Sequence, residues 1–271
     1  MKKFTFALFI SLFFSIPVFA QSSAAAIPSS TAPANASVAY ADQWSIFHNP
    51  AMLTSAKKTA ATLGYENKFF ISELSTVSAG VAIPTKYVQV GVAISRFGYS
   101  AYSETQAGIV LARSFSDKFS MGVQFNYYSV YFSPTERSQG VVIAQIGLLS
   151  ELAKGFYVGF NAYNPAQTNI KTELVEKRIP SIFNLGAMYR FSDKLLWVSQ
   201  VNKEIGSDVG WATGFEYQIV DALSVRLGGY GSPFVPSLGI GLHFGKFSFD
   251  ANFEQHPTLG ISSVGSLKYS F

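Results

Sequence analysis

The stretch that decides the fold ends the chain and reads Ile261-Ser262-Ser263-Val264-Gly265-Ser266-Leu267-Lys268-Tyr269-Ser270-Phe271. Alternate positions from Ile261 to Phe271 are mostly apolar or small, and the positions between them are polar except for Val264. A period of two sends these two sets to opposite faces of a β-strand. A last strand that ends on an aromatic residue is typical of the strand that closes a membrane β-barrel, although an edge strand of a soluble β-sandwich also alternates. The rest of the chain has to decide between the two.

The same alternation recurs at short intervals from Thr59 onward. The clearest runs cover residues 88–95, 120–127, 209–217, 237–244 and 246–254. We predict about fourteen strands, which begin near residues 59, 74, 87, 104, 119, 139, 155, 181, 194, 208, 222, 234, 246 and 259.

The links between these strands alternate in length. Links after even-numbered strands are short, as at Ser116-Asp117-Lys118 and Ser192-Asp193-Lys194. Links after odd-numbered strands are longer on average, and the longest runs from Asn164 to Pro180. Outer-membrane barrels have short turns at the periplasmic rim and longer loops at the outer rim. We therefore predict an all-β transmembrane barrel over residues 59–271, located in the outer membrane, with both termini in the periplasm.

The composition agrees with a barrel in a lipid bilayer. Hydrophobic residues make up 48% of the chain and charged residues 13%, whereas ordinary soluble domains carry about 25% charged residues. After residue 20 no uninterrupted apolar run approaches the length of a membrane-spanning helix. The net charge is +4, or +2 once Lys2 and Lys3 are subtracted, which predicts no nucleic-acid partner.

The N-terminal region reads as an export signal followed by a plug. Lys2 and Lys3 precede the apolar run 4–16, and Val18-Phe19-Ala20 offers small residues for cleavage before Gln21. We expect a signal peptide at residues 1–20, and a flexible leader rich in Ala, Ser and Pro followed by a plug at residues 21–58. The chain has no Cys, so neither a disulfide framework nor a lipid-anchored N-terminus is expected.

Turn geometry predicts a group of charges inside the barrel. If residues 220–222 form a three-residue turn, Glu216 and Arg226 become cross-strand neighbours on the lumen face. We expect Asp250, His243 and Lys268 to lie near this pair. Such a lumen charge network either holds the barrel together, which we favour, or selects substrates or ions.

Other features give little sign of chemistry. Four aromatic residues between 127 and 132 are interpreted as part of the interfacial girdle of a barrel, with a portal for hydrophobic substrates as the alternative. The three histidines, His48, His243 and His256, show no metal-ligand spacing and no arrangement with a nucleophile. We therefore predict no metal site, no cofactor and no enzymatic activity.

The segment before the first predicted strand carries a family resemblance. Phe47-His48-Asn49-Pro50-Ala51-Met52-Leu53 resembles the N-terminal region of FadL-type outer-membrane barrels. That superfamily includes long-chain fatty-acid transporters and the PorV/PorQ-like proteins of type IX secretion, and Ala41-Asp42-Gln43-Trp44 is more similar to the PorV/PorQ branch. The resemblance covers the chain from about residue 38. It implies a plug inside the barrel with Asn49 at its functional centre, carried here by Trp44, Phe47, Asn49, Pro50 and Ala51.

The resemblance implies two alternative functions. In the first, the barrel transports hydrophobic or small amphiphilic solutes passively, and displacement of the plug around Asn49 opens the way. In the second, it is a non-transporting component of a type IX secretion or cell-surface assembly, with secretion-system proteins as partners. The outer loops are short for the family, and only residues 164–180 offer much loop surface. A transporter should contain an apolar path past the plug, whereas a partner protein should keep a sealed lumen.

Overall fold

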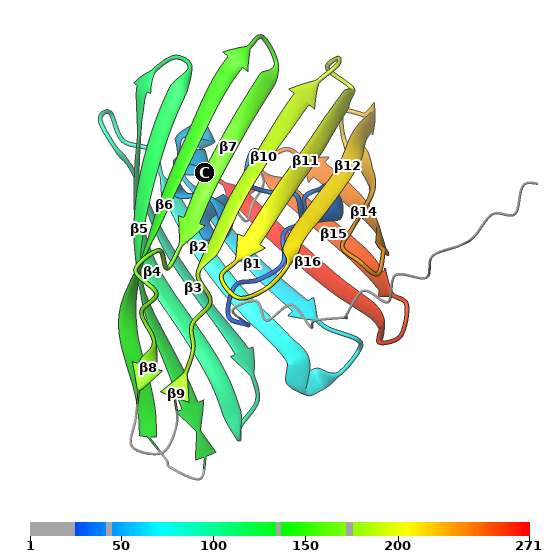
Figure 1. The fold of residues 1–271 in the computed structure, drawn as a ribbon. Coiled ribbons are helices and arrows are strands. Elements are labelled where there is room, and N and C mark those ends of the chain that lie inside the picture. Colours follow the sequence, from blue (N-terminus) through cyan, green and yellow to red (C-terminus); the bar gives the residue numbers. More distant parts are fainter. Residues whose placement is uncertain (1–24, 42–44, 134–136, 172–175) are drawn as a thin grey trace, which may run out of the picture.

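The computed structural model describes residues 25–41, 45–133, 137–171 and 176–271, in which fourteen antiparallel strands close into one barrel (Figure 1). The prediction of an all-β barrel of about fourteen strands is confirmed, and each barrel strand begins within two residues of its predicted start. The barrel strands are β1 (Ala60–Asn67), β2 (Ser75–Ile83), β3 (Gln89–Gly98), β4 (Tyr102–Ser116), β5 (Phe119–Phe132), β6 (Arg137–Ala153), β7 (Phe156–Tyr163), β10 (Ile182–Arg190), β11 (Leu195–Glu204), β12 (Val209–Val220), β13 (Leu223–Tyr230), β14 (Val235–Phe244), β15 (Phe247–His256) and β16 (Gly260–Ser270).

Barrel strands that are neighbours in space follow one another in sequence, with one interruption. Between β7 and β10 the chain forms a separate two-stranded sheet of β8 (Ile170–Lys171) and β9 (Glu176–Lys177), at the lower left of Figure 1. The barrel closes where β16 pairs with β1, which places Ser270 opposite Ala60. We call the rim that holds these two residues the terminal rim, and the opposite rim the loop rim. The two-residue turns 117–118, 154–155, 221–222 and 245–246 all lie at the terminal rim, as the link lengths predict.

The wall of the barrel is apolar outside and polar inside. On the outward face, Leu63, Phe249 and Leu267 are 59%, 43% and 42% exposed. On the inward face of β15, Asp250 and Asn252 are fully buried. A water-soluble barrel has the reverse arrangement, so this wall is suited to a lipid bilayer. None of the helices in the described part of the chain is long and apolar enough to cross a membrane.

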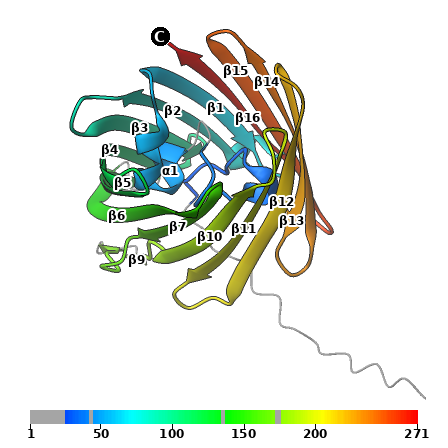
Figure 2. The same ribbon diagram turned by 90° about the horizontal axis from the view of Figure 1, so that it is seen from above.

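The lumen is filled by residues 25–41 and 45–58, which we call the insert (Figure 2). It contains the short helices η1 (Pro33–Asn35), α1 (Ser45–His48) and η2 (Pro50–Ser55), and a further helical turn, η3 (Ser72–Leu74), links β1 to β2. The expected flexible leader is not what the structure shows for residues 26–40, most of which are buried. Their small side chains let the backbone pass close to the walls, so the segment packs instead of extending into water. Trp44 and residues 1–20 lie outside the described residues.

Glycines on the lumen face leave the space in which the insert packs. A Cβ atom added at Gly147 would lie 2.8 Å from Pro50 Cδ, and one added at Gly214 would lie 2.7 Å from Pro33 Cβ. A Cβ atom at Gly122 would collide with the backbone of Pro50. The small inward residues make room for tightly packed protein in the lumen.

Candidate gate in the barrel lumen

Asn49 joins the two parts of the insert to the barrel wall. Its side-chain Oδ1 accepts a hydrogen bond from the Ala51 amide at 3.0 Å, which caps η2, and Pro50 takes the first helical position. Its Nδ2 donates to the Val38 carbonyl at 2.6 Å and to the Leu148 carbonyl of β6 at 3.1 Å. The side chain is fully buried. One amide therefore connects η2, the earlier segment of the insert and the wall.

An apolar contact holds the same half of the insert against the wall. Phe47 is 1% exposed and packs beside Ile46. The cluster around them consists of Leu53 from η2 and Ala93, Val110 and Ala112 from β3 and β4. The resemblance-derived plug residues Phe47, Asn49, Pro50 and Ala51 are thus all buried inside the barrel.

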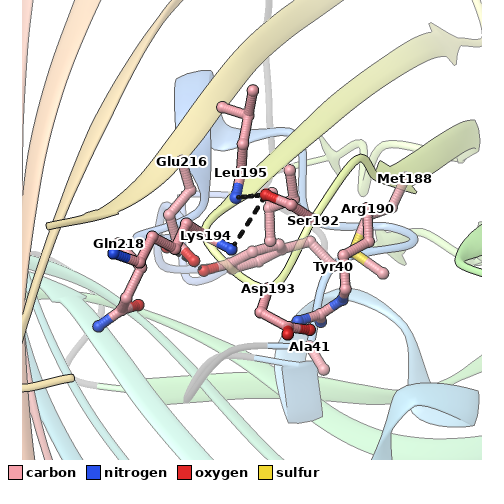
Figure 3. A pocket seen from close by; sticks show the side chains of 11 residues that line it. Tyr40, Ala41, Met188, Arg190, Ser192, Asp193, Lys194, Leu195, Glu216 and Gln218 are labelled. Carbon is pink, nitrogen blue, oxygen red and sulfur yellow. Dashed lines mark hydrogen bonds between the residues drawn. The ribbon is translucent and has the colours of Figure 1, made fainter. Parts of the chain in front are cut away.

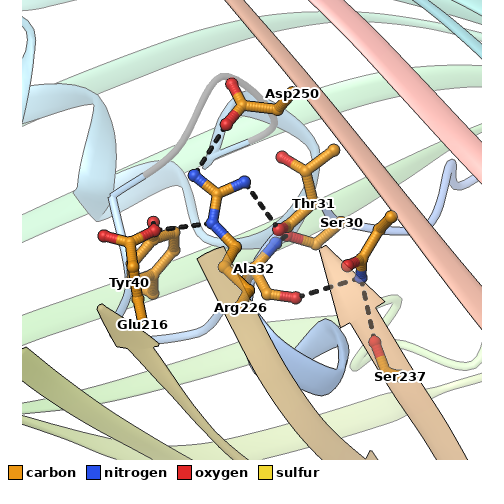
Figure 4. Close-up of polar contacts among 9 residues, drawn as sticks. Ser30, Thr31, Ala32, Tyr40, Glu216, Arg226, Ser237 and Asp250 are labelled. Atoms are coloured by element: carbon orange, nitrogen blue, oxygen red, sulfur yellow. Dashed lines mark hydrogen bonds and ion pairs between the residues drawn. The ribbon is translucent and has the colours of Figure 1, made fainter. Parts of the chain in front are cut away.

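Arg226 of β13 joins the other half of the insert to the opposite wall (Figure 4). The predicted register is confirmed, because Glu216 and Arg226 are direct cross-strand neighbours. Arg226 Nε lies 2.5 Å from Glu216 Oε2, and Arg226 Nη2 lies 2.6 Å from Asp250 Oδ1. Arg226 Nη1 donates to the Thr31 carbonyl at 3.2 Å. The Tyr40 hydroxyl donates to Glu216 Oε2 at 2.6 Å, so two residues of the insert take part in the ion network.

The remaining two residues expected in this network lie elsewhere on the lumen face. The cross-strand neighbours of Asp250 are Gly241 and Ser266. His243 and Lys268 come two residues later on the same two strands, closer to the terminal rim, where both pair with Ser248. Among the described residues neither makes an ion pair with Asp250. The expectation that they join Glu216 and Arg226 in one network is therefore wrong.

A small cavity opens the ion network to the terminal rim (Figure 3). It has a volume of about 150 Å³, and Tyr40 and Glu216 form part of its lining. Arg190, Asp193 and Lys194 contribute further charged groups. The Glu216 side chain is 14% exposed, whereas that of Asp250 is 0% exposed. Water and ions at the terminal rim can therefore reach one carboxylate of the network but not the other.

Residues 164–171 and 176–181, which we call the segment 164–181, pack against the inner wall of the barrel at the loop rim. Lys177 Nζ of β9 lies 2.7 Å from Glu104 Oε1 of β4, whose side chain is only 2% exposed. The hydroxyls of Tyr102 and Tyr128 also donate to this carboxylate. Asn164, which is fully buried, donates to two carbonyls at the base of the segment. The segment is thus held to the inner wall by a charge pair, which we call the latch, in which Glu104 is buried and Lys177 is 33% exposed.

The sequence did not predict that the residues of this latch meet one another. Tyr128 was assigned to the outer aromatic girdle, but it is fully buried on the lumen face, and its neighbour Tyr127 is 52% exposed. The alternation of β5 contained this signal, because Gln124, Asn126 and Tyr128 share one face. The pairing of Glu104 with Lys177 spans 73 positions of sequence and left no local signal.

The described residues contain no cluster of three or more His, Asp or Glu side chains that could hold a metal ion. No family model matches the sequence, and no curated protein matches it. Solved structures do match. The Pseudomonas putida toluene transporter TodX aligns with a TM-score of 0.67 at 10% identity, covering 93% of this chain and 97% of that one.

Two further matches agree with TodX. A TodX deltaS2S3 mutant, titled a monoaromatic hydrocarbon channel, gives a TM-score of 0.68 at 10% identity and covers 91% of this chain and 98% of its own. A Pseudomonas aeruginosa FadL homologue gives 0.60 at 13% identity, with 92% and 98% covered. At these identities the similarity shows the fold: the chain has the barrel fold of FadL-family transporters. These neighbours give the PorV/PorQ resemblance no support.

Proposed function

We propose that the chain is an outer-membrane barrel through which hydrophobic or small amphiphilic solutes pass, and that the insert is its gate. One observation carries this proposal: the lumen is filled by the insert, which is not part of the barrel wall. Only a few polar side chains, such as Asn49 of the insert and Arg226 of the wall, hold the insert in place. The apolar outward face of the wall and the fold shared with FadL-family transporters support it. We assign the terminal rim to the periplasm because short turns lie there.

Single-channel conductance in a planar bilayer tests the gate. The intact protein is expected to be mostly closed, and a variant without residues 21–58 is expected to conduct. Folding of each protein is checked by its heat-dependent mobility on a gel. A folded deletion variant that does not conduct would mean that the wall side chains seal the lumen, and transport would be rejected.

A disulfide lock tests the same gate without removing buried protein. A Cβ atom at Gly80 would lie 3.3 Å from Ile46 Cγ2, so Ile46→Cys with Gly80→Cys can join α1 to β2. The chain has no other Cys, and Gly80→Cys alone is the matched control. Oxidation should abolish openings, and a reductant should restore them. Openings that persist in the oxidised protein would show that the insert is not the gate.

One observation favours a second function. The insert fills the lumen, and Lys177 fixes the segment 164–181 to the inner wall at the loop rim, an arrangement that suits a non-transporting component of a secretion or cell-surface assembly. This alternative predicts no openings in the intact protein, whether oxidised or reduced. It also predicts that a folded deletion variant conducts without any specificity for solutes.

A further inference from the structure

Apolar side chains of the barrel wall, together with Ile170 and Ile179, cluster around Ala26 and Ile27 of the insert, and we call the space that Ala26 and Ile27 occupy the apolar chamber. Its walls are side chains that are at most 4% exposed: Tyr128, Ile143, Tyr163, Ile170 and Ile179. Ala26 of the insert is fully buried in it, and Ile27 packs against it. The wall residues Tyr128, Ile143 and Tyr163 come from β5, β6 and β7. The chamber is therefore filled by two residues of the proposed gate.

A group of four neutral amides adjoins this apolar chamber. Gln106, Gln124, Asn126 and Gln145 are each at most 1% exposed, and we call them the carboxamide group. Three of them are cross-strand neighbours of chamber residues. The pairs are Gln106 with Tyr128, Asn126 with Ile143, and Gln145 with Tyr163.

Each member of the carboxamide group has one polar atom with no hydrogen-bond partner among the described residues. Gln145 Nε2 donates to Asn161 Oδ1 and to two backbone carbonyls, which leaves its Oε1 unpaired. Gln106 Oε1 accepts from the Tyr163 hydroxyl, which leaves its Nε2 unpaired. Gln124 and Asn126 bond to each other, and whichever way the two amides are turned, one donor and one acceptor remain.

The charges beside the chamber are already paired. Glu104 accepts from Lys177, Tyr102 and Tyr128. A ligand with a carboxylate would bring a buried charge next to Glu104 with no cation free to pair with it among the chamber residues, which is unfavourable. A hydrocarbon would leave the amides unpaired, which is also unfavourable. A neutral ligand with a hydrogen-bonding group avoids both costs.

We propose that the apolar chamber and the carboxamide group together bind a neutral amphiphile. Its apolar body replaces Ala26 and Ile27, and its polar head exchanges hydrogen bonds with the carboxamide group. The inference rests on the proposed function, because it assigns the class of solute that the gate admits. Alcohols, amides and ketones with a compact apolar body belong to this class, whereas fatty-acid anions and plain hydrocarbons do not.

Three probes with one body and different heads test this assignment: 2-phenylethanol, phenylacetate and ethylbenzene. Their binding to the full chain in lipid nanodiscs is measured by ligand-observed NMR, with empty nanodiscs as the reference. We expect 2-phenylethanol to bind at least about tenfold more tightly than either other probe, since one buried hydrogen bond is worth about that factor. Gln124→Met should remove most of this preference. The exposed Gln255 provides the matched control, and Gln255→Met should leave it unchanged.

The outcomes separate the site from the gate. Equal or tighter binding of phenylacetate or ethylbenzene overturns the proposal. A preference that survives in folded Gln124→Met also overturns it, because the amides would then hold ordered water only. If Gln124→Met does not fold, Asn126→Leu serves as the second variant. Preferential binding without conductance in any variant leaves the site standing and removes the transport function, and conductance without preferential binding does the reverse.

Discussion

The insert rests on two walls of the barrel that differ in their polar chemistry. On the wall of β12 to β15, Arg226 donates through all three guanidinium nitrogens, to Glu216, Asp250 and the insert. On the wall of β4 to β7, the contacts are neutral hydrogen bonds through Asn49 and Gln145, and buried amide atoms remain without partners in the described chain. The first wall is an anchor. The second holds the insert more weakly, so we expect the insert to leave it first.

This difference lets the proposed gate be fixed at one wall and yield at the other. On the first wall the insert's contacts are hydrogen bonds to charged side chains, from Tyr40 to Glu216 and from Arg226 to the Thr31 carbonyl, and each is worth about 1.5–3 kcal/mol. Releasing a neutral hydrogen bond to water costs about 0.5–1.5 kcal/mol. η1 should therefore stay on its wall under conditions in which η2 moves. The variants below break one wall at a time.

The largest effect is expected on the anchoring wall. Arg226→Met would leave the carboxylates of Glu216 and Asp250 without their cation, and we expect the free energy of unfolding to fall by about 3–5 kcal/mol. Urea titration of the refolded protein in lipid vesicles measures it. Lys268→Met is the matched control. Lys268 lies on the same face, and its substitution removes the same charge from a residue that does not belong to the network. A loss no larger than that of the control would show that the network does not anchor the insert.

A substitution in the weaker wall that crowds the insert tests how firmly the insert is held there. The Cβ atom of Gly147→Ala would press on Asn49 and on Pro50 Cδ, and overpacking of this kind costs about 1–3 kcal/mol. We expect more frequent channel openings, because the insert can yield on this side. In Gly265→Ala the nearest heavy atom to the new Cβ would be 3.9 Å away, so this control should match the wild type. Openings that increase equally in both variants would point to a general loosening of the barrel.

The sequence predicted the barrel wall well because the alternation of residues within each strand shows which residues lie on which face. The period of two placed fourteen strands, and the turn at 220–222 gave the pairing of Glu216 with Arg226. The same reasoning failed for His243 and Lys268. Alternation tells which face a residue occupies but not its height along the barrel, and both side chains lie closer to the terminal rim than Asp250.

The sequence predicted the insert poorly for a different reason. Residues 26–40 have no helical or strand period, and their Ala, Ser and Pro content resembles that of a linker. Their burial depends on glycines such as Gly159 and Gly214, which are far away in sequence. The latch of Glu104 and Lys177 likewise depends on how the segment 164–181 folds back onto the wall. Contacts between distant segments left no pattern that a single sequence reveals.

The smallest effect is expected from pH, and it acts on the half of the insert whose apolar cluster includes residues of β4, in the weaker wall. His48 belongs to the insert and not to a membrane-spanning strand, and α1 packs against β3. Burial lowers the pKa of His48 to about 4, against an ordinary value of 6.5, so the docked side chain is neutral. The released state binds a proton more readily, and docking therefore loses stability as the pH falls below about 6.5, until the loss is complete near pH 4. Between pH 7 and pH 6 we expect a loss below about 1 kcal/mol in urea titrations. His48→Gln should abolish this pH-dependent difference, and a variant that kept it in full would assign the effect to other groups.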